Sequence, residues 1–161
     1  MSAPVTLWRI AADTPDYEAH DLSGIGAERA GGRWNRVGTP VVYASTSRSL
    51  ACLETVVHLA STPLPLNRYL VRIDVPSSAW KAAAVVTPAR LIGWDAEPAG
   101  AASLDWGARW TASKATLLAR VPSVIVPEEF NVLINPAHPE AGLVRATKVR
   151  KWLYDARLSP A

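Results

Sequence analysis

The sequence predicts an α+β fold, in which a mixed or split β-sheet is flanked by helices. Segments with strand-like alternation and segments with helical spacing both occur, but they do not follow one another as regularly as a doubly wound parallel sheet requires. Hydrophobic residues make up 49% and charged residues 19% of the 161 residues, so the chain can bury a core. We therefore expect a single globular domain over residues 1–161.

The first half of the chain is expected to form two strands and a helix around a glycine-rich segment. In order, these elements are a strand over Val5–Ala11, an ordered loop or lid over 17–38, a strand over Pro40–Ser45 and a helix over 47–60. Ser45, Thr46 and Ser47 are competent helix N-caps, because their hydroxyls can accept bonds from the first free amides. Pro63 and Pro65 are expected to stop the helix.

The second half is expected to supply a second helix and the remaining strands. Arg68–Val75 alternates between apolar and polar side chains, as a half-buried strand does. The region 76–102 is rich in Ala, Pro and Gly and is expected to be irregular. The other expected elements are a helix over Leu104–Ala119, strands over Val121–Pro127 and Asn131–Asn135, and a final strand or short helix over Val144–Leu153.

The sequence lacks the motifs that mark several classes of function. Neither GxGxxG nor GxxxxGK[ST] is present, so a Rossmann or P-loop nucleotide site is not indicated. His20, His58 and His138 are far apart and belong to no HxxxH or HExxH pattern, so no metal site is predicted. No GxSxG surrounds Ser123, and no nucleic-acid-binding motif is present.

The chain is expected to work in a reducing cytoplasm. It has no apolar run approaching about 18 residues and no apolar h-region at its N-terminus, so neither a membrane span nor a signal peptide is predicted. Cys52 is the single cysteine, which leaves no disulfide framework.

The formal net charge is +3, and one basic cluster lies near the C-terminus: Arg145, Lys148, Arg150 and Lys151. This cluster can be a solvated face of the protein. It can also contact a polyphosphate ligand or an acidic partner. The sequence leaves both interpretations open.

Glu54 is the most informative single residue. At 100° per residue, the expected helix places Leu50, Leu53 and Val57 on one apolar stripe, with Glu54 beside them. A carboxylate there is costly unless it is paired or functional, although it can also lie at the edge of the stripe and reach water. His58, one turn further on, could hydrogen-bond to Glu54, but a lone histidine near an apolar face is more often structural.

Four more residues are candidates because of their neighbours. Arg33 follows two glycines, which let the backbone approach a ligand, and its planar guanidinium suits phosphate oxygens, although a surface Arg in a turn is an equal alternative. Tyr43 in its expected strand is by itself a packing residue. Ser123, in a short apolar strand, can satisfy a buried hydrogen bond or hold a ligand group. Most of the other six tryptophans are expected to be structural, whereas Trp34 adjoins Arg33.

Four motifs follow one another in the order and at the intervals of a known family. They are GGRWN, PVVYAS, LETVVHL and PSVIVPEEFNVLINPAHP. Each motif is weak alone, but the four in order between residues 31 and 139 are specific. With them the chain resembles the RES-domain family, which is named for its Arg, Glu and Ser. The resemblance runs from LWRI to the closing YDARL.

This resemblance implies a toxin of a type II bacterial toxin–antitoxin pair, neutralised by an Xre-like antitoxin. It also implies a fold similar to the ADP-ribosyltransferases of the diphtheria-toxin kind, and cleavage of NAD at the nicotinamide–ribose bond. ADP-ribose would pass to water, to phosphate or to a protein such as phosphoribosyl pyrophosphate synthetase. NAD is then a substrate, no other cofactor is expected, and neither nucleic acid nor a membrane takes part.

The resemblance also assigns roles to residues. Glu54 would stabilise the positive charge of an oxocarbenium-like ribose, and Tyr43 would stack on the nicotinamide ring. Arg33 would neutralise the diphosphate, Ser123 would bond the ligand or orient Glu54, and Trp34 would close the pocket. The positions that correspond to those of the family are Arg33, Tyr43, Glu54 and Ser123, with Arg9 and Asn135 as further NAD-binding positions.

Two rival classes stay open. One is a non-enzymatic interaction module that binds a protein through its Trp-rich surface and its basic C-terminal cluster. The other is an RNase-type toxin, which the pI of about 9.3 permits. No pair of histidines suited to acid–base cleavage of RNA is evident, however.

Overall fold

The computed structural model describes residues 2–59 and 64–159, and its architecture is the α+β fold that the sequence predicts. Within this part of the chain, one sheet of seven strands runs in the order β4-β5-β6-β2-β1-β3-β7. Neighbouring strands are antiparallel except β4 and β5, which are parallel, so the sheet is mixed.

The elements have the following bounds. The strands are β1 Val5–Ala12, β2 Val42–Ser45, β3 Arg68–Val75, β4 Ala84–Val85, β5 Leu118–Pro122, β6 Phe130–Ile134 and β7 Arg145–Lys151. The helices are α1 Ile25–Ala30, α2 Arg48–Val56, α3 Ser77–Ala82 and α4 Ala101–Ser113, with single 3-10 turns at Ala141–Leu143 and Ala156–Leu158.

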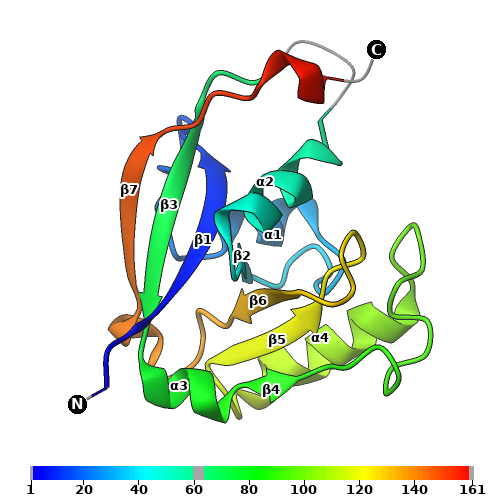
Figure 1. Ribbon diagram of the computed structural model, residues 1–161. Helices are drawn as coiled ribbons and strands as arrows, with labels where there is room; N and C mark the ends of the chain where they lie inside the picture. Colours follow the sequence, from blue (N-terminus) through cyan, green and yellow to red (C-terminus); the bar gives the residue numbers. More distant parts are fainter. Residues whose placement is uncertain (1, 60–63, 160–161) are drawn as a thin grey trace.

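The sheet divides into two parts that meet between β1 and β2. Strands β1 and β3 are in register along eight residue pairs, whereas β1 and β2 share the single pair Trp8 and Ser45. In Figure 1 the long strands β1, β3 and β7 stand together, and β4, β5 and β6 run at an angle to them. Helix α2 packs on β1 and β2 at the junction, and α4 packs beneath the second part.

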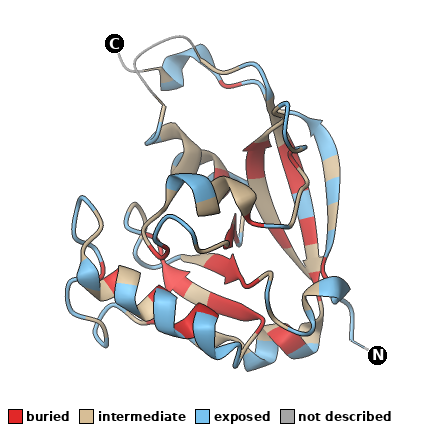
Figure 2. Cartoon of the chain, turned by 180° about the vertical axis from the view of Figure 1, so that it is seen from behind, coloured by how far each residue is buried: buried red, intermediate tan, exposed pale blue. Residues whose placement is uncertain are grey.

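Separate apolar clusters support the two parts of the sheet. Under α2, the side chains of Ile10, Ala51, Leu70 and Tyr154 are buried together. On the α4 side, three buried tryptophans pack with apolar side chains of β5 and β6: Trp34, Trp94, Trp110, Val121 and Leu133. Figure 2 shows that the buried residues follow the strands and the inner faces of the helices. Helix α2 is therefore held from below by β1 and β3 and by the C-terminal segment.

Four predicted elements need correction. The glycine-rich segment 17–38 contains α1, and the segment 76–102, expected to be irregular, contains α3, β4 and the first residues of α4. The helix predicted over 104–119 ends at Ser113, after which Lys114 takes a left-handed φ of 51°. Leu118 and Ala119 are instead buried in β5, which ends at Pro122 rather than at 127. For Leu118 and Ala119, burial in the sheet outweighs helical propensity.

Helix α2 is shorter than predicted, and its buried face differs. It begins after Ser47, whose hydroxyl accepts a bond from the N–H of Leu50 over 3.1 Å, and it ends at Val56. Residue 60 and Pro63 lie outside the described residues. Leu50 is buried, but Leu53 and Val57 are 38% and 57% exposed, so the predicted apolar stripe is wrong for these two residues.

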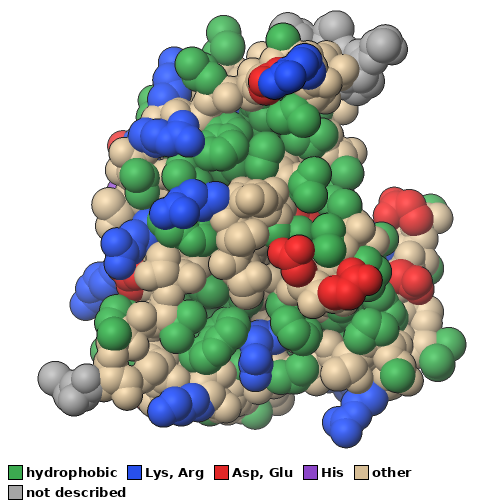
Figure 3. Space-filling view, in the orientation of Figure 1, with side chains coloured by type: hydrophobic (Ala, Val, Ile, Leu, Met, Phe, Trp, Pro, Cys, Tyr) green, Lys and Arg blue, Asp and Glu red, His purple; other side chains and the backbone are tan. Residues whose placement is uncertain are grey.

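The basic cluster lies on β7, an edge strand of the sheet. Figure 3 shows Lys and Arg side chains gathered along this edge of the molecule. Lys148 is paired with Asp13 at 2.9 Å and lies over the ring of Tyr69, 4.6 Å from its centroid. None of the helices in the described ranges is long and apolar enough to cross a membrane.

Candidate active site

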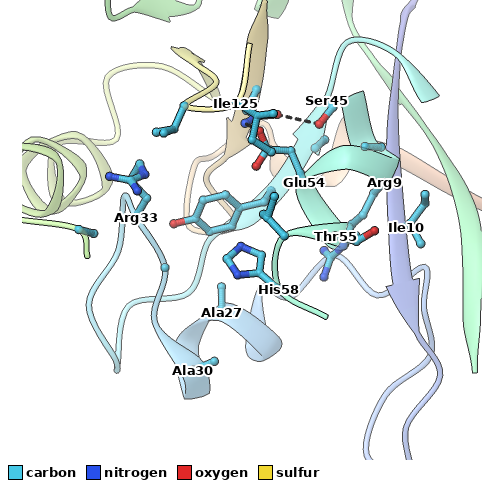
Figure 4. Close-up of a pocket in the computed structure, with 18 of the residues that line it drawn as sticks. Arg9, Ile10, Ala27, Ala30, Arg33, Ser45, Glu54, Thr55, His58 and Ile125 are labelled. Carbon is cyan, nitrogen blue, oxygen red and sulfur yellow. Dashed lines mark hydrogen bonds between the residues drawn. The ribbon is translucent and has the colours of Figure 1, made fainter. Parts of the chain in front are cut away.

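A cavity of about 980 Å³ opens beside α2, at the junction of the two parts of the sheet. Its walls come from β1, α1, β2, α2, the segment after α1, the turn before α4 and the turn between β5 and β6. Figure 4 shows the side chains that point into it. Four of the residues singled out from the sequence line this cavity: Arg9, Arg33, Tyr43 and Glu54.

The carboxylate of Glu54 is held through one oxygen. Its Oε1 accepts hydrogen bonds from Ser123 Oγ and from Asn131 Nδ2, each over 2.7 Å. Within the part of the chain that the structure describes, Oε2 has no hydrogen-bond partner. Both donors restrain the rotation of the carboxylate. One charged oxygen is therefore left for a ligand in the cavity.

Asn131 is a site residue that the sequence analysis did not identify. It begins the NVLIN segment and pairs in register with Ser45 across β2 and β6. Ser45 Oγ donates to Asn131 Oδ1 over 2.7 Å, and this bond orients the amide so that Nδ2 points to Glu54. An Asn in an apolar strand is only a weak indication of a functional residue. Its contact with Glu54 becomes evident only when β2 and β6 are paired.

Ser123 follows β5 and is fully buried. Its hydroxyl oxygen accepts bonds from the backbone N–H groups of Ile125 and Val126, each over 3.1 Å, and its proton is donated to Glu54. Ser123 does not itself line the cavity. Of the two roles expected for it, orienting Glu54 is the one that its contacts support.

Tyr43 forms part of the cavity wall and is fixed through its hydroxyl. The hydroxyl donates to Asn35 Oδ1 over 2.6 Å and accepts from the backbone N–H of Trp34 over 3.0 Å. Burial raises the pKa of this hydroxyl above its usual value, so it stays protonated. A Cβ on Gly32 would come within 2.7 Å of the hydroxyl oxygen, so this position requires a glycine.

Two arginines reach the cavity from different sides of Glu54 (Figure 4). The Arg33 guanidinium is paired with Glu97 at 2.6 Å and also donates to two backbone carbonyls. Arg9, on β1, forms no side-chain hydrogen bond or ion pair with residues in the described ranges. Its desolvation lowers the pKa of the guanidinium from the ordinary value, and an incoming anion would relieve that penalty.

Two expected site residues lie in the core rather than at the cavity. Trp34 is 3% exposed, and its ring packs edge-on against Trp106 at 5.6 Å between centroids. Asn135 is buried, and its Nδ2 donates to the carbonyl of Thr111 over 3.0 Å. The expectation that Trp34 closes the pocket is therefore corrected. Asn135 forms hydrogen bonds to the backbone of Thr111 and Ala137 and does not line the cavity.

His58 lines the cavity, although its position near an apolar face predicts a structural histidine outside the site. Its side chain forms no hydrogen bond with Glu54 in this structure. Among the residues that the structure describes, no group of three or more His, Cys, Asp or Glu side chains is placed to hold a metal ion. The cavity brings together an oriented carboxylate, a fixed aromatic ring and two guanidinium groups.

Comparisons with known proteins show the family of the chain. The chain belongs to the RES domain family, whose model matches residues 6–156, so the predicted resemblance is confirmed. It is 62% identical over 154 residues to the Prs ADP-ribosylating toxin of Sphingobium sp. (strain YBL2), covering 95% of this chain and 96% of that protein. It is also 40% identical to Toxin Res of Pseudomonas putida, with 94% and 98% of the two chains covered.

Proposed function

We propose that this protein is a toxin that cleaves NAD at the nicotinamide–ribose bond and transfers the ADP-ribose to a protein. The observation that carries the proposal is the carboxylate of Glu54, held through Oε1 by two donors and open through Oε2 to a cavity with two arginines. The 62% identity to a protein named Prs ADP-ribosylating toxin supports the same reaction class.

Glu54 would act on the ribose. Nicotinamide is a good leaving group, and its departure produces an oxocarbenium-like sugar. A fixed negative charge beside that sugar stabilises the transition state more than the ground state, because the positive charge develops only as the bond breaks. Ser123 and Asn131 hold the charged carboxylate in position before the reaction begins, so little reorganisation is needed during the reaction.

The other cavity residues would bind and position NAD. The ring of Tyr43 can stack on nicotinamide, and its two hydroxyl hydrogen bonds hold the ring in place. Arg33 and Arg9 can compensate the two negative charges of the diphosphate. NAD is thus a substrate that the reaction consumes, and the chain's own residues supply the chemistry.

The name of the Prs ADP-ribosylating toxin supports a proposal for the acceptor, and membership of the RES family supports one for the partner. We propose phosphoribosyl pyrophosphate synthetase as the acceptor of ADP-ribose, with water and phosphate as alternatives. We further propose an Xre-like antitoxin as the neutralising partner and the cytoplasm as the compartment, since NAD and this acceptor are found there.

The experiment is free nicotinamide release from NAD by the purified protein, beside Glu54→Ala and the control Glu140→Ala, an exposed carboxylate away from the cavity. Labelled NAD is added with the synthetase, with phosphate, or with neither. Release that depends on Glu54 supports the proposal, and the fate of the label identifies the acceptor. No release from folded, antitoxin-free protein would favour an interaction module, and full turnover by folded Glu54→Ala would overturn the role of Glu54.

A further inference from the structure

The guanidinium of Arg33 already has partners on the turn before α4. Its Nη1 donates to the carbonyls of Trp94 and Ala96 over 3.1 Å and 2.6 Å, and its Nη2 donates to Glu97 Oε2 over 2.6 Å. The Arg33 side chain is only 17% exposed. These three hydrogen bonds therefore occupy much of the guanidinium that a ligand could reach. A diphosphate that approaches Arg33 therefore meets a carboxylate already in place.

The partners of Arg33 differ in how firmly they are held. Trp94 is buried, so its carbonyl is anchored by the core. The Glu97 side chain is 77% exposed and lines the rim of the cavity. Exposed ion pairs are weak, because water competes for both groups. The Glu97 carboxylate can thus leave Arg33 for solvent, while the backbone carbonyls keep the guanidinium oriented.

We propose that Glu97 competes with the diphosphate of NAD for Arg33 and thereby sets the affinity of the cavity for its substrate. This inference rests on the proposed function. Without a ligand, the carboxylate compensates the charge of Arg33. With NAD bound, the phosphate oxygens replace it, and its remaining negative charge at the rim weakens binding by repulsion.

A second ion pair, which joins the segment after α1 to α4 itself, provides a matched control. Arg36 Nη2 is paired with Asp105 Oδ1 at 2.7 Å, close to the length of the Arg33–Glu97 pair. Neither Arg36 nor Asp105 lines the cavity. Asp105→Asn therefore removes a similar link between these segments without altering the charge at the cavity.

The test is the dissociation constant of ADP-ribose and of adenosine, measured by calorimetry for the wild type, Glu97→Gln and Asp105→Asn. We expect Glu97→Gln to bind ADP-ribose about three- to tenfold more tightly, as one repelling charge is removed at close range. Adenosine has no diphosphate, so its affinity should not change. Asp105→Asn should match the wild type with both ligands, and added salt should reduce the gain.

The outcomes separate this inference from the proposed function. Equal or weaker binding of ADP-ribose by Glu97→Gln, with an unchanged melting temperature, would overturn the competition. An equal gain for adenosine would overturn it too, because the effect would then not come from the diphosphate. A wild-type protein that binds no ADP-ribose and releases no nicotinamide would instead overturn the NAD site itself.

Discussion

Ser123 and Glu54 are 69 residues apart in the chain, and a hydrogen bond of 2.7 Å joins them. The bond links the turn that follows β5 to α2, which forms one wall of the cavity. Asn131, 77 residues from Glu54, donates to the same carboxylate oxygen. The position of the carboxylate therefore depends on the relative placement of α2, β5 and β6, and the predictions below test that placement.

Glu54→Gln should lose nearly all NAD cleavage, by about 10²- to 10³-fold in kcat, because the side chain keeps its shape but loses its charge. The amide oxygen of the new Gln can still accept the bonds from Ser123 and Asn131, so the substitution isolates the loss of charge. The measurement is steady-state nicotinamide release, with circular dichroism to show that the variant is folded. Turnover within a few fold of the wild type would exclude the electrostatic role.

Asn131→Ala should lower kcat about ten- to hundredfold and change KM little. Without Nδ2, the carboxylate of Glu54 keeps only its bond to Ser123 and can rotate away from the ribose. The measurement is the dependence of the initial rate on NAD concentration. The control is Ser113→Ala, which removes a bond to a helix carbonyl far from the cavity. A rise in KM alone would contradict an orienting role for Asn131.

Tyr43→Phe should retain most NAD cleavage but lose stability. The ring stays in the cavity wall, whereas Asn35 Oδ1 and the N–H of Trp34 each lose a buried partner. The expected loss is about 1–3 kcal/mol of unfolding free energy, which thermal unfolding measures as a drop of several degrees in Tm. Tyr43→Ala should lose cleavage as well. If Tyr43→Phe were as inactive as Tyr43→Ala, the hydroxyl and not the ring would carry the function.

Gly107→Ala should destabilise the protein strongly. A Cβ at this position would lie 1.7 Å from the carbonyl oxygen of Trp34, and backbone atoms cannot move aside as a flexible side chain can. We expect a loss of about 2–4 kcal/mol in chemical denaturation. Gly142→Ala, where no atom lies within 4 Å of the new Cβ, serves as the control. Similar stability of the two variants would show that α4 and the Trp34 segment are not in close contact.

Asp13→Asn should destabilise the protein at neutral pH but not in acid. The hydrogen bond from Lys148 lowers the pKa of Asp13 below its ordinary value, and the N–H of Ala19 adds to the effect. A depressed carboxyl pKa stabilises the fold above the unfolded pKa, and this stabilisation is lost as the pH falls through the folded value. The Tm difference between wild type and Asp13→Asn should therefore shrink between pH 7 and pH 3.

The control for Asp13 is Asp16→Asn, which breaks the more exposed pair with Arg29. Exposed pairs contribute little, so its Tm should stay close to that of the wild type at both pH values. A constant difference between Asp13→Asn and wild type across the pH range would show that packing, rather than the charge of Asp13, is responsible.

Local features of the sequence predicted much of the fold. The α+β class, the strands near residues 5, 42, 68 and 131, and the start of α2 at its Ser47 cap all follow from alternation and capping chemistry. The same local logic failed at Leu118 and Ala119, which are good helix formers but lie buried in β5. Propensity is a weak preference, and burial in a sheet overrides it.

The sequence by itself determined the family, since its motifs need only order and spacing, and it identified Arg33, Tyr43, Glu54 and Ser123 as the residues to examine. Only the tertiary structure decided which other residues join them. Asn131 meets Glu54 because β2 and β6 pair in register, and Glu97 meets Arg33 because α4 brings its preceding turn to the cavity. Trp34, adjacent to Arg33 in sequence, points into the core instead. Such contacts depend on strand register and packing over long sequence separations, which no local pattern encodes.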